Sequence, residues 1–363
     1  MAQVAHSDAP QRRVTLFPGE SVADAAREAI AFGADALARS RAAAESGEAE
    51  PLHQFRVTTR RLRASIELFS VVLYASQLRL FRRDLAWISA QAGAVRECDV
   101  TATLIEERTA KIEPELARAI TPMIEALRAR RSEEHATLRA LLESKRYRGL
   151  TDRLSRPALK KVGGDRKLGI AAPQLLRAAG RAATRQGERL AQDAPAIVFH
   201  KLRVRIKRLR YSLEMMAPLG AKRHKKALAR LEELQELLGL YHDVTVCAEW
   251  LLAYAESAGA PLRTVMAAGA LIQSLAAREA KLRRRCRRQW RRFERSEIVH
   301  ETFDEIRRAG RLALMPASSS AIDAATDPRN GEAPSASQID DSEHASENAV
   351  GATNEHSATE MRP

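Results

Sequence analysis

Two stretches of the sequence carry histidine, arginine and lysine at the same spacing. His53 begins the first, HQFRVTTRRLR, and His200 begins the second, HKLRVRIKRLR. The two stretches lie 147 positions apart, and both read H-x-x-R-V-x-x-[R/K]-R-L-R. Arginine suits phosphate and carboxylate groups, because its planar fork makes paired charge-assisted hydrogen bonds. We therefore interpret the repeat as a surface that binds an anion.

On a helix, each copy places its cations in one row beside an apolar stripe. At about 100° per residue, the cations of the first copy fall within an arc of roughly 80°. The predicted rows are His53, Arg56, Arg60 and Arg63 in the first copy, and His200, Arg203, Lys207 and Arg210 in the second. The predicted core-facing stripes are Leu52, Phe55, Thr59, Leu62, Ile66 and Phe69, and Phe199, Leu202, Ile206, Leu209, Leu213 and Met216. The sequence thus predicts two helices of one design.

A row of charges on a helix is ordinarily its solvated face, and this is the alternative interpretation of both rows. Solvated faces usually mix signs, because opposite charges three or four residues apart stabilise a helix and like charges repel. Neither row contains an acid before Glu67 and Glu214, which stand at matching positions. The same repulsion in both copies favours a bound anion that neutralises it.

The charge of the whole chain supports an anionic partner. The 363 residues carry a formal net charge of +14, and the sequence pI is about 10.2. The segment from Pro316 to the end has nine acids and two arginines, so the rest of the chain is more basic still. Such a body attracts nucleic acid, membrane headgroups or phosphate chains. Aromatic residues make up 4% of the chain, which argues against base stacking on a single strand.

The sequence also predicts a soluble, cytoplasmic protein without a bound cofactor. Cys98, Cys247 and Cys286 are scattered and form no C-x-x-C pair, which suits a reducing compartment. The first residues contain no apolar core of signal-peptide length. No run approaches the roughly 18 apolar residues of a membrane span, so we expect none.

The fold class follows from periodicity and repetition. No stretch alternates with the period of two that a strand requires, so we expect an all-α protein. The repeat indicates two pseudo-symmetric helical bundles that arose by internal duplication. The predicted organisation is a flexible leader 1–18, a first helical repeat 19–155, a linker 156–172, a second helical repeat 173–312 and a disordered acidic tail 313–363.

Caps and breakers predict where individual helices end. Ser21 is expected to cap the first helix. Gly93 and Gly239 are expected to end helices, and Asp99 to cap the helix after the first of them. Pro173 is expected to restart the scheme after the linker. The amphipathic stretches expected to be long helices are 115–143 and 261–293.

A second repeated element follows the two glycines. Aligned on them, Arg96 matches His242 and Glu97 matches Asp243. A His-Asp pair occurs in metal phosphohydrolases, but that chemistry needs more histidine and acidic ligands than the spacing supplies. We therefore favour a helix cap and a polar contact between bundles over metal catalysis.

Two further segments are strongly basic. Lys281–Arg295, reading KLRRRCRRQWRRFER, is denser in arginine than either motif. An exposed basic helix and an auxiliary patch for a polyanion explain it equally well. Lys222–Lys226 is a compact basic cluster at the beginning of its helix, and its Lys225 matches Arg79 of the first copy.

These motifs resemble the CHAD family, the conserved-histidine α-helical domain, over roughly residues 20–310. The resemblance implies two helical bundles around a basic central channel that binds inorganic polyphosphate, often with recruitment to polyphosphate granules. With the matched residues added, the predicted polyphosphate-binding set is His53, Arg56, Arg60, Arg61, Arg63, Arg79, Arg96, His200, Arg203, Lys207, Arg208, Arg210, Lys225 and His242.

The sequence departs from the family pattern at three places. Glu97 replaces the usual aspartate, and Thr245 stands where a second acid is common. Residues 48–52, EAEPL, lack the lysine of the E-x-E-x-K motif in the triphosphate-tunnel domain that is often fused to this family. We therefore expect a stand-alone binding module without catalytic residues or a metal. The alternatives are a sequence-nonspecific nucleic-acid-binding protein and, with less support, a polyphosphate hydrolase.

Overall fold

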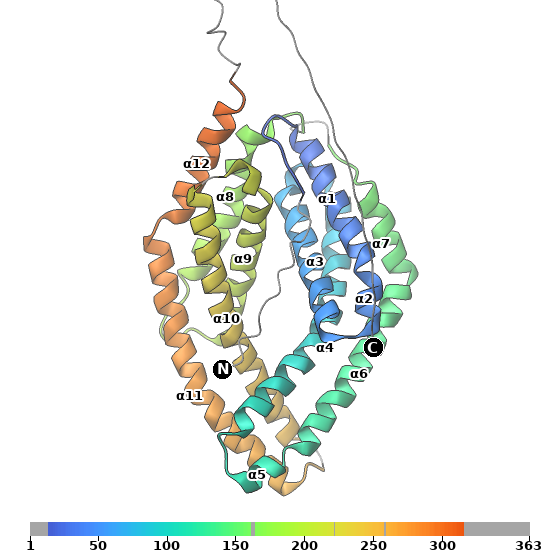
Figure 1. Cartoon of the computed structure of the whole chain (residues 1–363), viewed down its shortest axis with the longest axis vertical. Coiled ribbons are helices and arrows are strands. Elements are labelled where there is room, and N and C mark those ends of the chain that lie inside the picture. The colour runs from blue at the N-terminus through green and yellow to red at the C-terminus, as the bar shows by residue number, and fades with distance from the viewer. Residues whose placement is uncertain (1–13, 161–163, 221, 258, 316–363) are drawn as a thin grey trace, which may run out of the picture. The chain divides into compact units, whose positions relative to one another are not determined.

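The computed structural model describes residues 14–160, 164–220, 222–257 and 259–315, and these form helices without a strand among them (Figure 1). The helices of the first half are α1 (Val22–Arg39), α2 (Arg41–Ser46), α3 (Ala49–Leu68), α4 (Ala75–Thr109), α5 (Pro114–Arg118), α6 (Thr121–Glu143) and α7 (Lys145–Ser155). Those of the second half are α8 (Leu168–Gly187), α9 (Ala196–Met215), α10 (Lys222–Ala255), α11 (Leu262–Arg295) and α12 (Ile298–Leu312). The predicted all-α class is confirmed.

α3 and α9 carry the two histidine motifs, and each buries the stripe predicted from its sequence. Phe55 and Leu62 of α3 are fully buried, as are Leu202 and Ile206 of α9. The remaining members of both predicted stripes are buried as well. Because the apolar stripe of each helix is packed inward, its cation row is held at the margin of the core. α3 and α9 also contact each other, which brings the two rows into one region (Figure 1).

The predicted helix ends at Gly93 and Gly239 are wrong. α4 and α10 run through these glycines without interruption, so Asp99 lies within α4 and caps nothing. A glycine inside a helix costs about 1 kcal/mol, and the packing of α4 on α6 and of α10 on α11 outweighs it. A Cβ atom at Gly239 would have the Nε of Arg203 as its nearest neighbour, at 3.9 Å. The glycine therefore leaves space beside a motif arginine.

The first helix of the second half begins earlier than predicted. α8 starts at Leu168, five residues before Pro173, so the proline lies inside the helix. The carbonyl oxygens of Pro18 and Glu20 accept hydrogen bonds of 2.9 Å from the first N–H groups of α8, and this anchors the early start. Leu16 is fully buried. The predicted flexible leader is thus packed against the fold from residue 14 onward, and residues 1–13 lie outside the described part.

Two other boundaries differ from expectation. The stretch predicted as one helix at 115–143 divides into α5 and α6, and Pro122 stands in the first turn of α6, where its missing N–H costs nothing. α7 and α12 were not predicted as separate helices. α12 crosses α8 at Gly310 and Gly169. Glycine is needed for this close approach, because a Cβ atom on Gly310 would collide with the carbonyl oxygen of Gly169. From residue 316, the predicted acidic tail lies outside the described residues.

The apolar core crosses the boundary between the halves. One buried cluster belongs to the first half and includes Phe55, Phe81 and Tyr147. The other joins the second half to Phe69 and Ile105, which belong to the first. The C-terminal part of α4 therefore packs with the second half, and the described residues of both halves form one compact unit.

A buried carboxylate joins α4 to α7. Asp84 is fully buried and accepts hydrogen bonds from Arg83 at 3.0 Å, Arg146 at 2.9 Å and Arg153 at 2.8 Å. Burial acts to raise the pKa of Asp84, but the guanidinium groups of Arg83 and Arg146 hold it below its ordinary value. Arg146 also lies over the ring of Trp87, 4.1 Å from its centroid. Removing one member of such a buried set leaves charges without partners.

Candidate functional site

Four helices bring the motif cations of both halves together. The pKa of Arg56 on α3 falls to about 9, first because of burial and then because Arg60, Arg96 and Arg203 are near. The pKa of Lys207 on α9 lies well below its ordinary value, through burial and then through Arg203, Arg60 and Arg56. Cations of α3 and α9 therefore act on one another. We call the following half-buried side chains the central cation cluster: His53, Arg56, Arg60, Arg96, His200, Arg203, Lys207 and His242.

Four members of the cluster make no direct ion pair among the described residues. Within the described ranges, no carboxylate oxygen lies within 4.0 Å of Arg56, Arg60, Arg203 or Lys207. The Nε atom of Arg203 is buried without a hydrogen-bond partner, and that of Arg60 donates to the carbonyl oxygen of Arg56 at 3.2 Å. Half-buried charges of one sign raise the free energy of the unliganded fold. An anion in the cluster would neutralise them and supply the missing acceptors.

The histidines of the cluster are kept neutral at pH 7. Burial, followed by the charges of Arg60 and Arg96, lowers the pKa of His53 to about 4. Burial likewise lowers the pKa of His242 to about 3, with Arg203 next in effect. The Nδ1 atoms of His200 and His242 are 3.4 Å apart, so in a hydrogen bond between them one donates and the other accepts.

Asp243 brings an acid into the cluster. Burial raises its pKa, although Arg203 and Lys207 act in the opposite direction. Glu97, at the matching position of α4, also has a raised pKa, mainly through burial. Among the described residues, no group of three or more His, Cys, Asp or Glu side chains is placed to hold a metal ion. Glu97 and Asp243 therefore reduce the positive charge of the site, which remains strongly cationic.

Two predicted arginines form reciprocal ion pairs between the halves. Arg208 on α9 lies 3.1 Å from Glu67 on α3, and Arg61 on α3 lies 3.6 Å from Glu214 on α9. Each residue has its counterpart 147 positions away, so the two pairs are equivalent. Reciprocal pairs of this kind are the pattern expected of a two-fold relation between α3 and α9. The acids that end the two cation rows thus join the halves, which spacing along one helix does not reveal.

Arg210 and Arg63 also lie beside acids. Arg210 pairs with Glu214 at 2.9 Å and with Glu232 at 2.8 Å. Arg63 is exposed by surface area, yet partial burial lowers its pKa while nearby Glu67 acts to raise it. The last cation of each predicted row is therefore partly neutralised by protein carboxylates.

Arg79 and Lys225 lie apart from the central cation cluster. Both are exposed near the beginnings of α4 and α10. At 1.5 Å per residue, each is about 25 Å along its helix from Arg96 or His242. Aligning the two copies of the repeat matched these residues to each other, but an alignment does not give their distance from the central cation cluster.

A hollow beside Arg96 adds two arginines that sequence reasoning did not select. Its volume is about 340 Å³, and its lining includes Arg128 and Arg131 of α6 together with Asp99. The Nε of Arg131 donates to Asp99 at 2.5 Å. α6 carries neither motif, so the basic run RARR at 128–131 was the sole signal in the sequence.

Comparisons with known proteins agree with this all-α fold. A family model described as CHAD domain matches residues 28–252. A crystal structure of the CHAD domain from the plant Ricinus communis is similar, with a TM-score of 0.64 and 24% identity over 77% of this chain and 96% of that one. PptA from Streptomyces chartreusis has a TM-score of 0.63 and 17% identity over 75% of this chain and 99% of its own.

Among curated relatives, the Mycobacterium tuberculosis proteins Rv2226 (strain H37Rv) and MT2285 (strain CDC 1551) are each 27% identical over 255 residues. The match covers 66% of this chain and 46% of theirs, so the chain spans about half the length of these relatives. In the described part of the chain, no helix is both long and apolar enough to span a membrane.

Proposed function

This chain belongs to the CHAD domain family, and we propose that it binds inorganic polyphosphate in a basic channel formed around the central cation cluster. The observation that carries the proposal is the set of half-buried cations, Arg56, Arg60, Arg203 and Lys207, without a carboxylate partner among the described residues. Each half contributes one pair of them, at equivalent positions. A ligand with a negative charge at every unit meets cations repeated along two helices better than a compact anion does.

We further propose that binding is non-catalytic and that the protein works in the cytoplasm as an adaptor or at polyphosphate granules. Arginine and lysine hold phosphate groups without cleaving the anhydride bonds between them. No assembled group of acidic or histidine metal ligands is found among the described residues, so nothing there favours a metal-activated hydrolase. A sequence-nonspecific nucleic-acid-binding protein remains the second candidate, because it would use the same positive charge.

A competition experiment separates the two ligands. Labelled long-chain polyphosphate is bound to the protein at physiological salt and displaced by unlabelled polyphosphate, single-stranded RNA or double-stranded DNA at equal phosphate concentration. We expect polyphosphate to compete at a concentration at least about tenfold lower than either nucleic acid, a difference of about 1.4 kcal/mol. Equal competition by RNA or DNA would contradict the proposal and favour the second candidate.

Binding is expected to strengthen as the pH falls. In the free protein the pKa values of His53 and His242 are about 4 and about 3. A bound polyanion favours the charged imidazoles and raises both values in the complex. Protons are therefore taken up on binding between the free and bound pKa values, and affinity should rise from about pH 7 down to about 4. Without ligand, the same depressed values make the fold lose stability as the pH falls from 6.5, the ordinary histidine pKa, towards 4.

Calorimetry in buffers of different ionisation enthalpy measures this proton uptake directly. The double variant His53→Gln/His242→Gln should bind with a flatter pH profile and take up fewer protons. A variant with an unchanged profile would assign the pH dependence to the phosphates or to other side chains, not to these histidines.

A further inference from the structure

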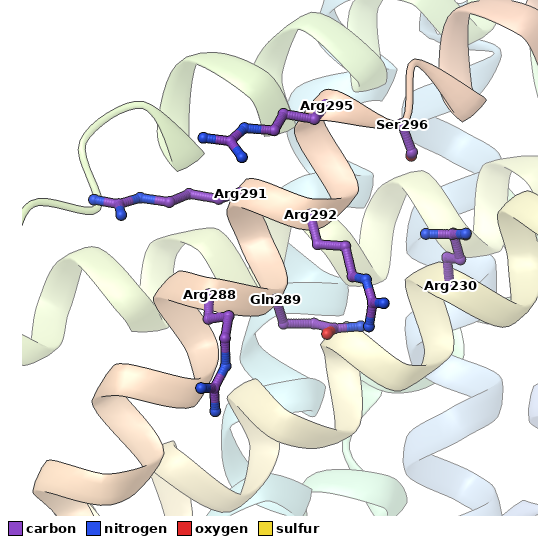
Figure 2. A pocket seen from close by; sticks show the side chains of 7 residues that line it. All are labelled: Arg230, Arg288, Gln289, Arg291, Arg292, Arg295 and Ser296. Carbon is purple, nitrogen blue, oxygen red and sulfur yellow. The ribbon is translucent and has the colours of Figure 1, made fainter.

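An arginine-lined groove lies between α10 and α11. It is open, has a volume of about 840 Å³, and is lined by Arg230, Arg288, Gln289, Arg291, Arg292 and Arg295, with Ser296 at its end. In Figure 2, Arg291 and Arg295 project to one side of α11, Arg288 and Arg292 project from other sides of it, and Arg230 projects from α10. The four arginines of α11 are exposed, and Arg230 is half-buried. We call these five side chains the groove arginines.

The groove arginines differ from the arginines of α11 that stabilise the bundle. Arg283 donates to Glu279 at 3.0 Å, to the carbonyl oxygen of Ala194 at 2.6 Å and to the hydroxyl of Tyr241 at 3.0 Å. Arg287 donates to the carbonyl oxygen of Leu190 at 3.3 Å. In the described part of the chain, no groove arginine lies within 4.0 Å of a carboxylate oxygen. The positive charge on the groove side of α11 is therefore not neutralised by an ion pair within the described residues.

Helix-end electrostatics explains part of this pattern and no more. The carbonyl groups of a last turn favour basic side chains, which accounts for Arg292 and Arg295. Arg288 lies about two turns before the helix end, and Arg230 belongs to a different helix. An acid does reach the groove lining at Gln289, whose amide donates a hydrogen bond to Glu233 at 3.1 Å. Five cations on two helices thus line one groove, and none of them pairs with a carboxylate in the part of the chain that the structure describes.

We propose that this groove is a second contact for polyphosphate, outside the central cation cluster. Its lining contains arginine, glutamine and serine and no aromatic ring, so it suits phosphate groups without bases to stack. Arg230 and Asp243 lie on the same helix, separated by about 20 Å along its axis. A long chain can occupy both places at once, whereas tripolyphosphate is too short to do so. The identity of the ligand rests on the proposed function; the groove itself does not.

The consequence is a dependence of affinity on chain length. Once a long polyphosphate chain is bound at one place, its second contact forms at a high effective concentration and adds affinity. A short ligand cannot make both contacts and gains no affinity from the second. The test compares tripolyphosphate with long-chain polyphosphate on the full chain and on Arg288→Gln/Arg292→Gln. The matched control is Arg284→Gln/Arg285→Gln, which removes two exposed arginines of the same helix that do not line the groove.

We expect the groove variant to bind long-chain polyphosphate about tenfold more weakly, with tripolyphosphate affinity unchanged. Its slope of log K against log salt should fall by about 1.4 for the long chain, at about 0.7 per lost phosphate contact. The control should keep both affinities. Unchanged long-chain binding in the groove variant, or an equal loss in the control, overturns the inference.

Failure of the proposed function gives a different result. If tripolyphosphate does not bind, and replacing Arg203 and Lys207 leaves long-chain binding intact, the central cation cluster is not a polyphosphate site. The groove variant would then still report on the groove, because long-chain binding would depend on it alone.

Discussion

Replacing Arg203 and Lys207 together by glutamine is expected to weaken polyphosphate binding at least about 100-fold and, at the same time, to stabilise the unliganded protein. Hydrogen bonds to charged groups contribute about 1.5–3 kcal/mol each, so losing two costs about 3 kcal/mol or more. The free protein holds these cations half-buried. Burial is the main cause that lowers the pKa of both, neighbouring cations add to it, and Asp243 acts in the opposite direction. Removing them relieves repulsion, and we expect the free energy of unfolding to rise by about 1 kcal/mol.

The equivalent change in the other half should behave in the same way. Arg56→Gln/Arg60→Gln removes the residues 147 positions earlier. If both rows contact one ligand, each double variant should keep one-site stoichiometry and lose similar affinity. Two independent sites would instead leave half the binding capacity at unchanged affinity.

The matched control for both variants is Arg79→Gln/Lys225→Gln. It removes the same charge from exposed positions about 25 Å along their helices from the cluster. Titration of labelled polyphosphate measures affinity, and thermal unfolding without ligand measures stability. A control that loses as much affinity as the cluster variants would mean that net positive charge, and not this arrangement, binds the ligand.

Asp84→Asn is expected to cause the largest loss of stability. The side chain of Asp84 is fully buried and joins Arg83, Arg146 and Arg153. Losing the hydrogen bonds of this fully buried carboxylate costs about 1.5–3 kcal/mol. The cost is lower than for a wholly buried ion pair, because the side chains of Arg83, Arg146 and Arg153 are 63%, 39% and 36% exposed and can be solvated. Urea unfolding measures the change, and the folded fraction should still bind polyphosphate with unchanged affinity, since Asp84 is outside the central cation cluster.

Asp35→Asn is the control for this variant. Asp35 pairs with Arg39 on the exposed side of α1, and exposed pairs contribute about 0–1 kcal/mol. Equal effects of the two substitutions would show that the hydrogen bonds of Asp84 do not stabilise the packing of α7 on α4.

The sequence by itself determined the helical class, the two motif helices and the buried face of each. Phe55 and Leu62, like Leu202 and Ile206, are buried as predicted, because the period of an amphipathic helix is a local property. The same periodicity singled out Arg56 and Arg203 as cations of equivalent position. Every member of the central cation cluster belongs to the predicted set, because each follows from the repeat and needs no distance between helices.

Tertiary structure decided how these residues divide into roles. Arg61 and Arg208 pair with acids of the opposite half, whereas Arg79 and Lys225 lie far along their helices. The prediction that Gly93 ends a helix was wrong, because packing along both sides of α4 outweighs the local cost of one glycine.

The groove arginines show the same limit. Nothing in the spacing of Arg288 and Arg292 places Arg230 beside them, because Arg230 precedes Arg288 by 58 positions and belongs to another helix. Periodicity along a chain states which side chains share a face of one helix. Which faces meet depends on how the helices pack, and that packing is set by the free energy of the whole core and by no single segment.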